Sequence, residues 1–150
     1  MIRANRGRGC IGQLLAEFRS ETDRVLRGDL ARALGAVPDS TALGNALALM
    51  LDPAIDIRDS QNILWSATSR EDTRGLARVF VTEHADALIA RLPPQSGAGL
   101  VYALTSRCDD SDAAALREFA DDKFGALPGA RRRIDQAFER MSQCAAEKAA

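Results

Sequence analysis

The stretch PGARRRIDQAFERMSQCA, residues 128–145, places Arg131, Arg132 and Arg133 in a row at the front of an amphipathic helical pattern. Guanidinium groups bind phosphates and carboxylates, so this cluster is a candidate contact for nucleic acid, a membrane surface or a protein carboxylate. The whole chain carries 20 lysines and arginines against 21 acids, a net charge of -1. Because a nucleic-acid binder needs a basic field, this balance argues against that function.

The charges on the same helix allow a simpler interpretation of the arginines. Asp135 follows Arg131 by four residues and Arg132 by three, a spacing at which side chains pair on a helix surface. A solvated face of mixed charge is then sufficient. However, each cation in the first turn of a helix opposes the helix dipole, at a cost of about 0.3–1 kcal/mol. We therefore expect the cluster to contact a carboxylate beyond its own helix, in a neighbouring helix, another domain or the carboxyl end of a peptide.

The single histidine, His84, gives little basis for a metal site or an acid–base site. A catalytic zinc uses three protein ligands, often with two histidines one helical turn apart, which this chain does not supply. His84 also shares a helical face with Phe80 and Leu88, so we expect it to pack at the edge of the core. The sequence has no serine-nucleophile elbow and no phosphate-binding glycine loop. It predicts no catalytic residue, no metal ligand and no cofactor in this chain.

The cysteines indicate the cellular environment. Cys10, Cys108 and Cys144 are an odd number with no C-x-x-C pair, which favours neither a disulfide framework nor a zinc ribbon. We expect unpaired thiols and a reducing, cytoplasmic location. No stretch approaches the roughly 20 apolar residues of a membrane span, and Gln13 and Glu17 interrupt the opening apolar segment, which disfavours a signal peptide. We therefore expect a soluble protein with no membrane partner.

The apolar pattern favours an all-α fold, since alanine and leucine dominate and no long stretch alternates with period 2. The length of 150 residues suffices for one domain with its own core. We predict a single domain over residues 1–150, with a disordered or non-native start at residues 1–9. It is an array of seven or eight antiparallel helices in HEAT-like superhelical hairpins. The expected helices lie at about 11–20, 23–35, 39–52, 59–67, 71–91, 100–104, 115–124 and 128–145.

Particular residues mark the ends of these helices. Ser20 to Asp23 is typical of an N-cap with an acid three residues on, and Asp39 is placed to cap the next helix. Pro53 disfavours helical structure at Asp52, and the pair of prolines at 93–94 ends the longest helix.

Three segments together resemble zinc aminopeptidases of the aminopeptidase N and puromycin-sensitive type. ALGAVPDSTALGNALALMLD, residues 33–52, and TSREDTRGLARVFVTEHADALIARLP, residues 68–93, are similar to a helical hairpin of that family and to the helix that follows it. PGARRRIDQAFERMSQCAA, residues 128–146, resembles the family's final helix, whose characteristic positions here hold Pro128, Ala130, Arg132, Ile134, Gln136 and Glu139. The resemblance covers most of residues 20–146.

The resemblance implies the C-terminal helical domain of such an enzyme, a non-catalytic cap that closes over the catalytic domain and encloses the peptide cavity. The expected partners are that catalytic domain and a peptide substrate. The H-E-x-x-H motif, the distal glutamate ligand and the G-A-M-E-N motif belong to domains that this sequence does not contain, so zinc is implied only there. The chain is then a fragment of a larger enzyme, and Arg132 falls at a position that the family keeps as arginine.

Two other functions stay open at the level of sequence. The chain is alternatively a freestanding HEAT-like adaptor whose groove binds a protein or a peptide. Nucleic-acid binding through the three arginines is a third hypothesis, which the charge balance disfavours. Several hundred upstream residues carrying H-E-x-x-H would distinguish the first function from the second.

Overall fold

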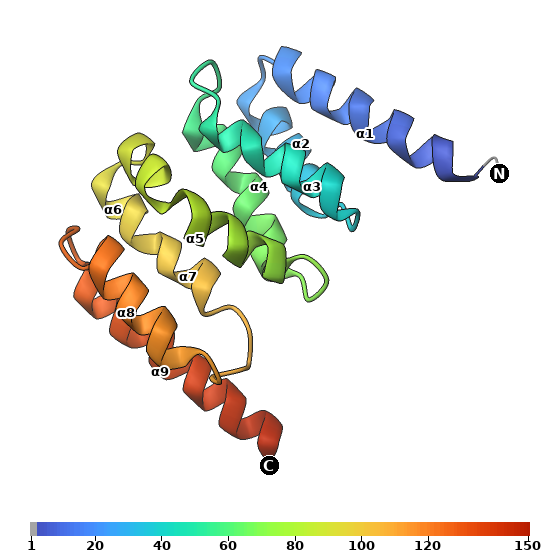
Figure 1. Ribbon diagram of the computed structural model, residues 1–150. Coiled ribbons are helices and arrows are strands. Elements are labelled where there is room, and N and C mark those ends of the chain that lie inside the picture. Colours follow the sequence, from blue (N-terminus) through green and yellow to red (C-terminus); the bar gives the residue numbers. More distant parts are fainter. Residues whose placement is uncertain (1–2) are drawn as a thin grey trace. The chain divides into compact units, whose positions relative to one another are not determined.

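The computed structural model describes residues 3–150, with side chains from Gly9 onward, and consists of helices joined by short turns (Figure 1). No strand occurs among these residues, which confirms the predicted all-α class. The HEAT-like arrangement of the hairpins stays a prediction. The elements are α1 (Arg3–Ser20), α2 (Arg24–Gly35), α3 (Ser40–Leu47), η1 (Ala48–Leu51), α4 (Ile57–Ser69), α5 (Arg74–Arg91), α6 (Pro94–Gly97), η2 (Ala98–Leu100), α7 (Val101–Leu104), α8 (Ala113–Phe124) and α9 (Ala130–Ala149).

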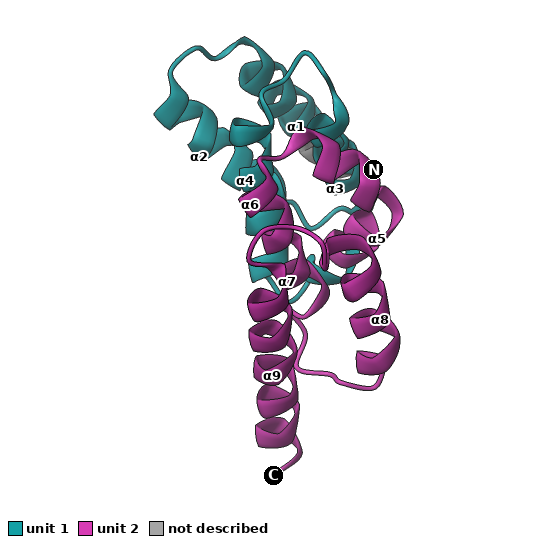
Figure 2. Cartoon of the chain, turned by 90° about the vertical axis from the view of Figure 1, so that its left-hand side faces the viewer, with its two compact units in different colours: residues 1–76 teal, residues 77–150 magenta. Residues whose placement is uncertain are grey.

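The chain divides into two compact units (Figure 2). Unit 1 comprises residues 1–76 and unit 2 comprises residues 77–150. The single domain over residues 1–150 stays a prediction. Each unit contains its own set of buried apolar side chains.

The expectation of a disordered or non-native start at residues 1–9 stays a prediction. Helix α1 already begins at Arg3, and it ends at Ser20 as predicted. The part of that expectation that concerns residues 1–2 lies outside the described residues.

Aspartates start three of the helices in unit 1. The carboxylate of Asp23 accepts hydrogen bonds from the backbone N–H groups of the first turn of α2, and that of Asp39 does the same for α3. The cap at Asp39 is confirmed. The predicted cap at Ser20, with Asp23 as the acid three residues on, is wrong, because Ser20 still belongs to α1 and Asp23 itself is the N-cap of α2. For α4 the expected start at about Asp59 is wrong, because Asp56 accepts from the N–H of Arg58 and the helix begins at Ile57.

The core of unit 1 forms where α2 packs against α4, the most extensive helix pair among the described residues. The closest approach is at Gly35, where an added Cβ would lie only 2.3 Å from the carbonyl oxygen of Ile63. Asp59 is buried beside the same pair of helices, 3.5 Å from a guanidinium nitrogen of Arg24 and 3.6 Å from one of Arg27. The apolar core consists of Phe18, Ala31, Leu34, Leu43, Ala46, Leu47, Met50, Ile63, Leu64 and Ala67.

Unit 2 is built on the long helix α9. The run of short helices from Pro94 to Leu104 and helix α8 both pack against α9. Helix α5 ends at Arg91, before the two prolines as predicted, but it begins at Arg74 and is kinked at His84. The core consists of Val81, Leu88, Leu100, Val101, Leu104, Ala120, Phe124, Ile134, Phe138 and Met141.

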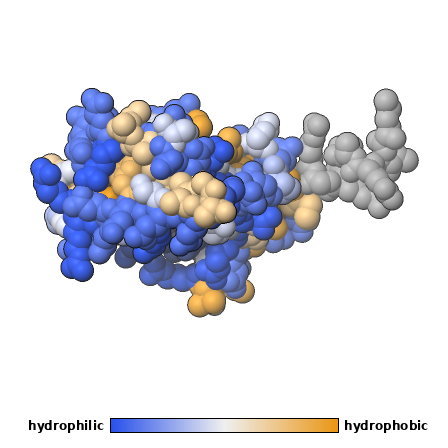
Figure 3. All heavy atoms as spheres, turned by 90° about the horizontal axis from the view of Figure 1, so that it is seen from below, coloured by the Kyte–Doolittle hydropathy of each residue, from blue (hydrophilic) through white to orange (hydrophobic). Residues whose placement is uncertain are grey.

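The surface is mainly hydrophilic on the face shown in Figure 3, with small apolar patches between the polar residues. This agrees with the 27% of charged residues in the sequence. Among residues 3–150, no helix combines the length and the apolar character that crossing a membrane requires.

Asp56 makes the stability of unit 1 depend on pH. Its carboxylate accepts hydrogen bonds from the guanidinium of Arg58, 2.6 Å from Nη2, and from the backbone N–H of the same residue. These bonds lower the pKa of Asp56 from 3.8 to about 2. Since the folded pKa lies below the unfolded value of about 3.9, the stabilisation is present above about pH 4 and is lost as the pH falls toward about 2.

We expect Asp56→Asn, which keeps a capping oxygen and removes the charge, to lower the free energy of unfolding at pH 7 by less than about 1 kcal/mol. The effect is small because the Asp56 side chain is 35% exposed and solvent screens the ion pair. The difference between wild type and variant should shrink between pH 4 and pH 2. Urea denaturation followed by circular dichroism measures it, and a difference that is constant over this range would contradict the assignment.

Candidate functional site

The candidate site is the beginning of α9, where Gly129 lets the chain turn into the helix. Gly129 has φ 71°, a left-handed conformation that glycine adopts without strain, and with no side chain it offers no cap to the helix. Ala130 is buried directly after it. The three arginines therefore occupy the first turn, as the sequence predicts, and no acidic residue is present in that turn.

Arg133 points into unit 2. Its Nη1 donates a hydrogen bond to the backbone carbonyl of Gln95 in α6, at 2.6 Å. The guanidinium also lies over Gly99, where an added Cβ would be 3.5 Å from Nη1. Arg133 thus links α9 to α6 through a carbonyl oxygen, not a carboxylate.

Arg131 and Arg132 have a different environment, since both are exposed. The expected pairing of these residues with Asp135 is wrong. Asp135 instead accepts a hydrogen bond from Arg117 of α8, and this bond raises the pKa of Arg117. The Arg117 guanidinium also covers the ring of Phe138, 5.6 Å from the ring centroid, which fixes it beside Asp135.

Two exposed cations are therefore left in the first turn of α9. Within residues 9–150, where side chains are described, Arg131 and Arg132 form no ion pair and no side-chain hydrogen bond. The carboxylate partner that the sequence predicts for the cluster is not present among the described residues of unit 2, and it stays a prediction.

His84 lies where the sequence places it, at the edge of the core. Its ring is half-buried and packs on Phe80 of the preceding turn, with 4.9 Å between the ring centroids. The described residues contain no group of three or more histidines, cysteines, aspartates or glutamates that could hold a metal ion. The geometry gives His84 a packing role.

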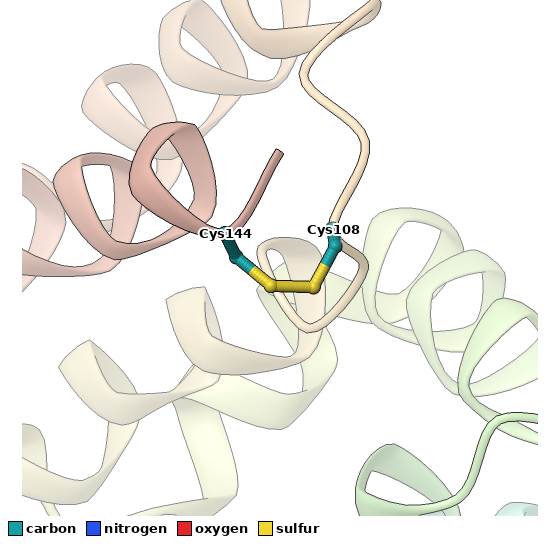
Figure 4. The surroundings of a disulfide bond; sticks show 2 residues. All are labelled: Cys108 and Cys144. Atoms are coloured by element: carbon teal, nitrogen blue, oxygen red, sulfur yellow. A yellow bond between two sulfur atoms is a disulfide. The ribbon is translucent and has the colours of Figure 1, made fainter. Parts of the chain in front are cut away.

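The cysteines correct the expectation of unpaired thiols. Cys108, in the turn after α7, and Cys144, near the end of α9, form a disulfide with 5.0 Å between their Cα atoms (Figure 4). Cys10 is free and exposed. The pair is separated by 36 residues, so only the packing of α7 and α9 brings the two sulfur atoms together.

A pocket of about 280 Å³ adjoins the disulfide, at the opposite end of α9 from the three arginines. Its lining includes both cysteines, two further arginines and no acid. Sequence reasoning did not find this pocket, because it depends on the same packing as the disulfide. The principal lining residues are Tyr102, Arg107, Cys108, Arg140, Met141 and Cys144.

The fold and the site together define a class: an all-α helical domain with an exposed basic helix start and, among its described residues, no cluster of metal ligands. Comparison with protein families gives the particular group. The family model of the ERAP1-like C-terminal domain matches residues 1–143, so the chain belongs to that family, which confirms the resemblance to aminopeptidase C-terminal domains. Neither the curated proteins nor the solved structures contain a significant match to this chain.

Proposed function

We propose that this chain is the non-catalytic cap of a zinc aminopeptidase, which encloses the substrate cavity and contacts the catalytic domain or the peptide. The observation that supports it most is the family match over residues 1–143. The exposed Arg131 and Arg132, which have no partner among the described residues of unit 2, supply cations for a carboxylate of the catalytic domain or of a peptide. Zinc and the chemical step belong to the catalytic domain.

The test is Arg132→Ala in the full-length enzyme. A contact far from the scissile bond contributes only when a long substrate or a closed state is present to be stabilised. We therefore expect a change of several-fold or more in kcat/KM for long peptides, while hydrolysis of a one-residue chromogenic substrate stays nearly intact. Equal loss on short and long substrates would refute the proposed contact.

The isolated chain gives the matching control. Arg132→Ala there should change the free energy of unfolding by no more than about 0.5 kcal/mol, as for other exposed side chains. Arg133→Ala should cost about 1–3 kcal/mol, because it removes a charge-assisted hydrogen bond to the Gln95 carbonyl. Similar effects of the two substitutions would mean that Arg132 also has a structural role.

A specific observation also favours the second candidate, a freestanding adaptor that binds a protein or a peptide. Val25 and Leu26 of α2 are 73% and 50% exposed. Leu26 also lines a groove of about 470 Å³ in unit 1, together with Leu30, Ala33 and the acids Glu17, Glu21 and Asp29. An apolar floor with an acidic rim suits a basic amphipathic segment. Catalytic activity of a longer protein that contains the chain would decide against this candidate.

We also propose the cytoplasm as the location. The exposed free thiol of Cys10 suits a reducing compartment. In such a compartment a disulfide is usually transient and reactive, so the Cys108–Cys144 bond would form and break there. Rapid alkylation of cells followed by mass spectrometry would measure the oxidised fraction, and a fully oxidised pair would argue for an oxidising compartment instead.

A further inference from the structure

The Cys108–Cys144 disulfide joins two segments that contribute no buried side chain to the core of unit 2. In α9, Met141 is the last buried residue, and from Ser142 onward the helix is half-buried or exposed. On the other side, the turn at residues 105–112 carries only half-buried and exposed residues. The disulfide is thus the covalent link that holds this turn against the last turns of α9 (Figure 4).

Breaking the bond leaves the core of unit 2 in place. Helix α9 keeps its packing through Ala130, Ile134, Ala137, Phe138 and Met141, all of which precede Cys144. Both cysteines are half-buried, and they line an open pocket, so a small thiol reaches the sulfur atoms without unfolding the unit. A reversible opening therefore affects the turn and the last turns of α9 but not the rest.

The pocket around the disulfide is positively charged. Arg107 is the neighbour of Cys108 in sequence, and Arg140 lies one helical turn before Cys144, on the same face of α9. Both are exposed, and neither forms an ion pair within the described side chains. The acids of the turn, Asp109, Asp110 and Asp112, are exposed and do not line the pocket.

A third cation strengthens this field. The Nε and Nη2 atoms of Arg78 are buried and have no hydrogen-bond partner. Burial lowers the pKa of Arg78, and the charge of Arg107 lowers it further, whereas the charges of Asp112 and Asp109 act in the opposite direction. Asp109 and Asp112 offset part of this positive charge, but neither lines the pocket, whose charged lining residues are Arg107 and Arg140. An incoming anion is favoured over an incoming cation.

We propose that the Cys108–Cys144 disulfide is a site of thiol–disulfide exchange with small anionic thiols, such as carboxylate-bearing thiols of the glutathione type, and that its opening releases residues 105–112 and the last turns of α9. A thiolate attacks one sulfur, which forms a mixed disulfide and expels the other cysteine as a thiolate. A second thiolate attacks the outer sulfur of the mixed disulfide and leaves the second cysteine as a thiolate. The protein disulfide gains two electrons, and two small thiols become one small disulfide.

The test compares two reagents on the oxidised chain of residues 1–150. 2-Mercaptoethanesulfonate is an anionic thiol and cysteamine is a cationic one, and both are used at equal thiolate concentration and low salt. Alkylation followed by mass spectrometry at Cys108 and Cys144 gives the rate of opening. The measured quantity is the ratio of the opening rate with the anionic thiol to the rate with the cationic thiol. The same ratio for the disulfide in the urea-unfolded chain is the reference. We expect the ratio in the folded chain to exceed the reference by about fivefold or more, and to fall toward it in high salt.

The matched variants remove two positive charges each. Arg107→Gln with Arg140→Gln should bring the ratio of rates down to the unfolded reference. Arg58→Gln with Arg70→Gln, both in unit 1 and outside the pocket lining, should leave the ratio unchanged. A folded ratio equal to the unfolded one, or an equal effect of the two double variants, would overturn the proposed anion selectivity.

Hydrogen exchange tests the opening itself. In the reduced chain, and in Cys108→Ser with Cys144→Ser, amide exchange should speed up at least about tenfold at residues 105–112 and 142–149. Amides at residues 130–141 should keep their protection. Unchanged exchange in the turn would show that the bond is not its anchor, and loss of protection throughout unit 2 would show a purely structural disulfide.

Discussion

Replacing Phe124 with alanine is expected to lower the free energy of unfolding by about 3–5 kcal/mol. Phe124 is completely buried at the end of α8, in the core of unit 2, and its ring meets that of Phe119 edge to face, with 6.1 Å between the centroids. The truncation removes a large apolar surface from the core and leaves a cavity that the surrounding helices fill only in part. Urea denaturation followed by circular dichroism would measure the loss.

Phe119 provides the matched control, because it is the same residue type in the same helix and is not buried. Phe119→Ala loses the ring contact and part of the buried area, so we expect a smaller cost of about 1–2 kcal/mol. If the two substitutions cost the same, or if Phe124→Ala costs less than about 1 kcal/mol, the ring of Phe124 is not a central part of the core.

The helices could be predicted largely from local features of the sequence. The apolar stripe of the last helix, which includes Ile134, Phe138 and Met141, is buried as its spacing indicates. Asp39 caps its helix because capping needs only the side chain and the next few backbone N–H groups. Such signals act over a single turn of helix, and a sequence displays them directly.

The predictions from sequence are wrong where the interaction partner of a side chain lies far away in the sequence. Asp56 and Asp59 are both suitable at a helix start, and the sequence alone does not say that Asp59 is drawn to Arg24 and Arg27 of α2, which leaves the cap to Asp56. Asp135 pairs with Arg117 of another helix for the same kind of reason. Local spacing predicts local partners, whereas packing brings in competitors from elsewhere in the chain.

In the candidate sites too, some features follow from the local sequence and others depend on packing between helices. The position of the three arginines in the first turn of α9 follows from the helix pattern, but the inward direction of Arg133 depends on where α6 lies. The disulfide and its pocket depend wholly on how α7 and α9 pack, because Cys108 and Cys144 carry no spacing signal. The packing of His84 against Phe80 was predictable, since the two residues lie one turn apart.

Replacing Gly35 with alanine is expected to lower the free energy of unfolding. The same replacement at a helical glycine with free space around it raises that free energy. Gly35 ends α2 where it touches α4, and a Cβ there would lie 2.3 Å from the Ile63 carbonyl oxygen and 2.6 Å from the Cβ of Ser66. Neither neighbour is the free end of a flexible side chain, so the two helices must move apart. The movement also strains the hydrogen bond of 2.7 Å from the Ser66 hydroxyl to the Arg32 carbonyl. We expect Gly35→Ala to cost about 1–3 kcal/mol.

Gly44, inside α3, is the matched control, because a Cβ there would meet nothing within 4 Å. Gly44→Ala should raise the free energy of unfolding by about 0.5–1 kcal/mol, since alanine loses less conformational freedom than glycine when a helix forms. Urea midpoints of the two variants should therefore move in opposite directions from that of the wild type. Hydrogen exchange should also become faster in α2 and α4 of Gly35→Ala. A midpoint for Gly35→Ala at or above that of the wild type would mean that α2 and α4 do not approach as closely at this point as the structure has them.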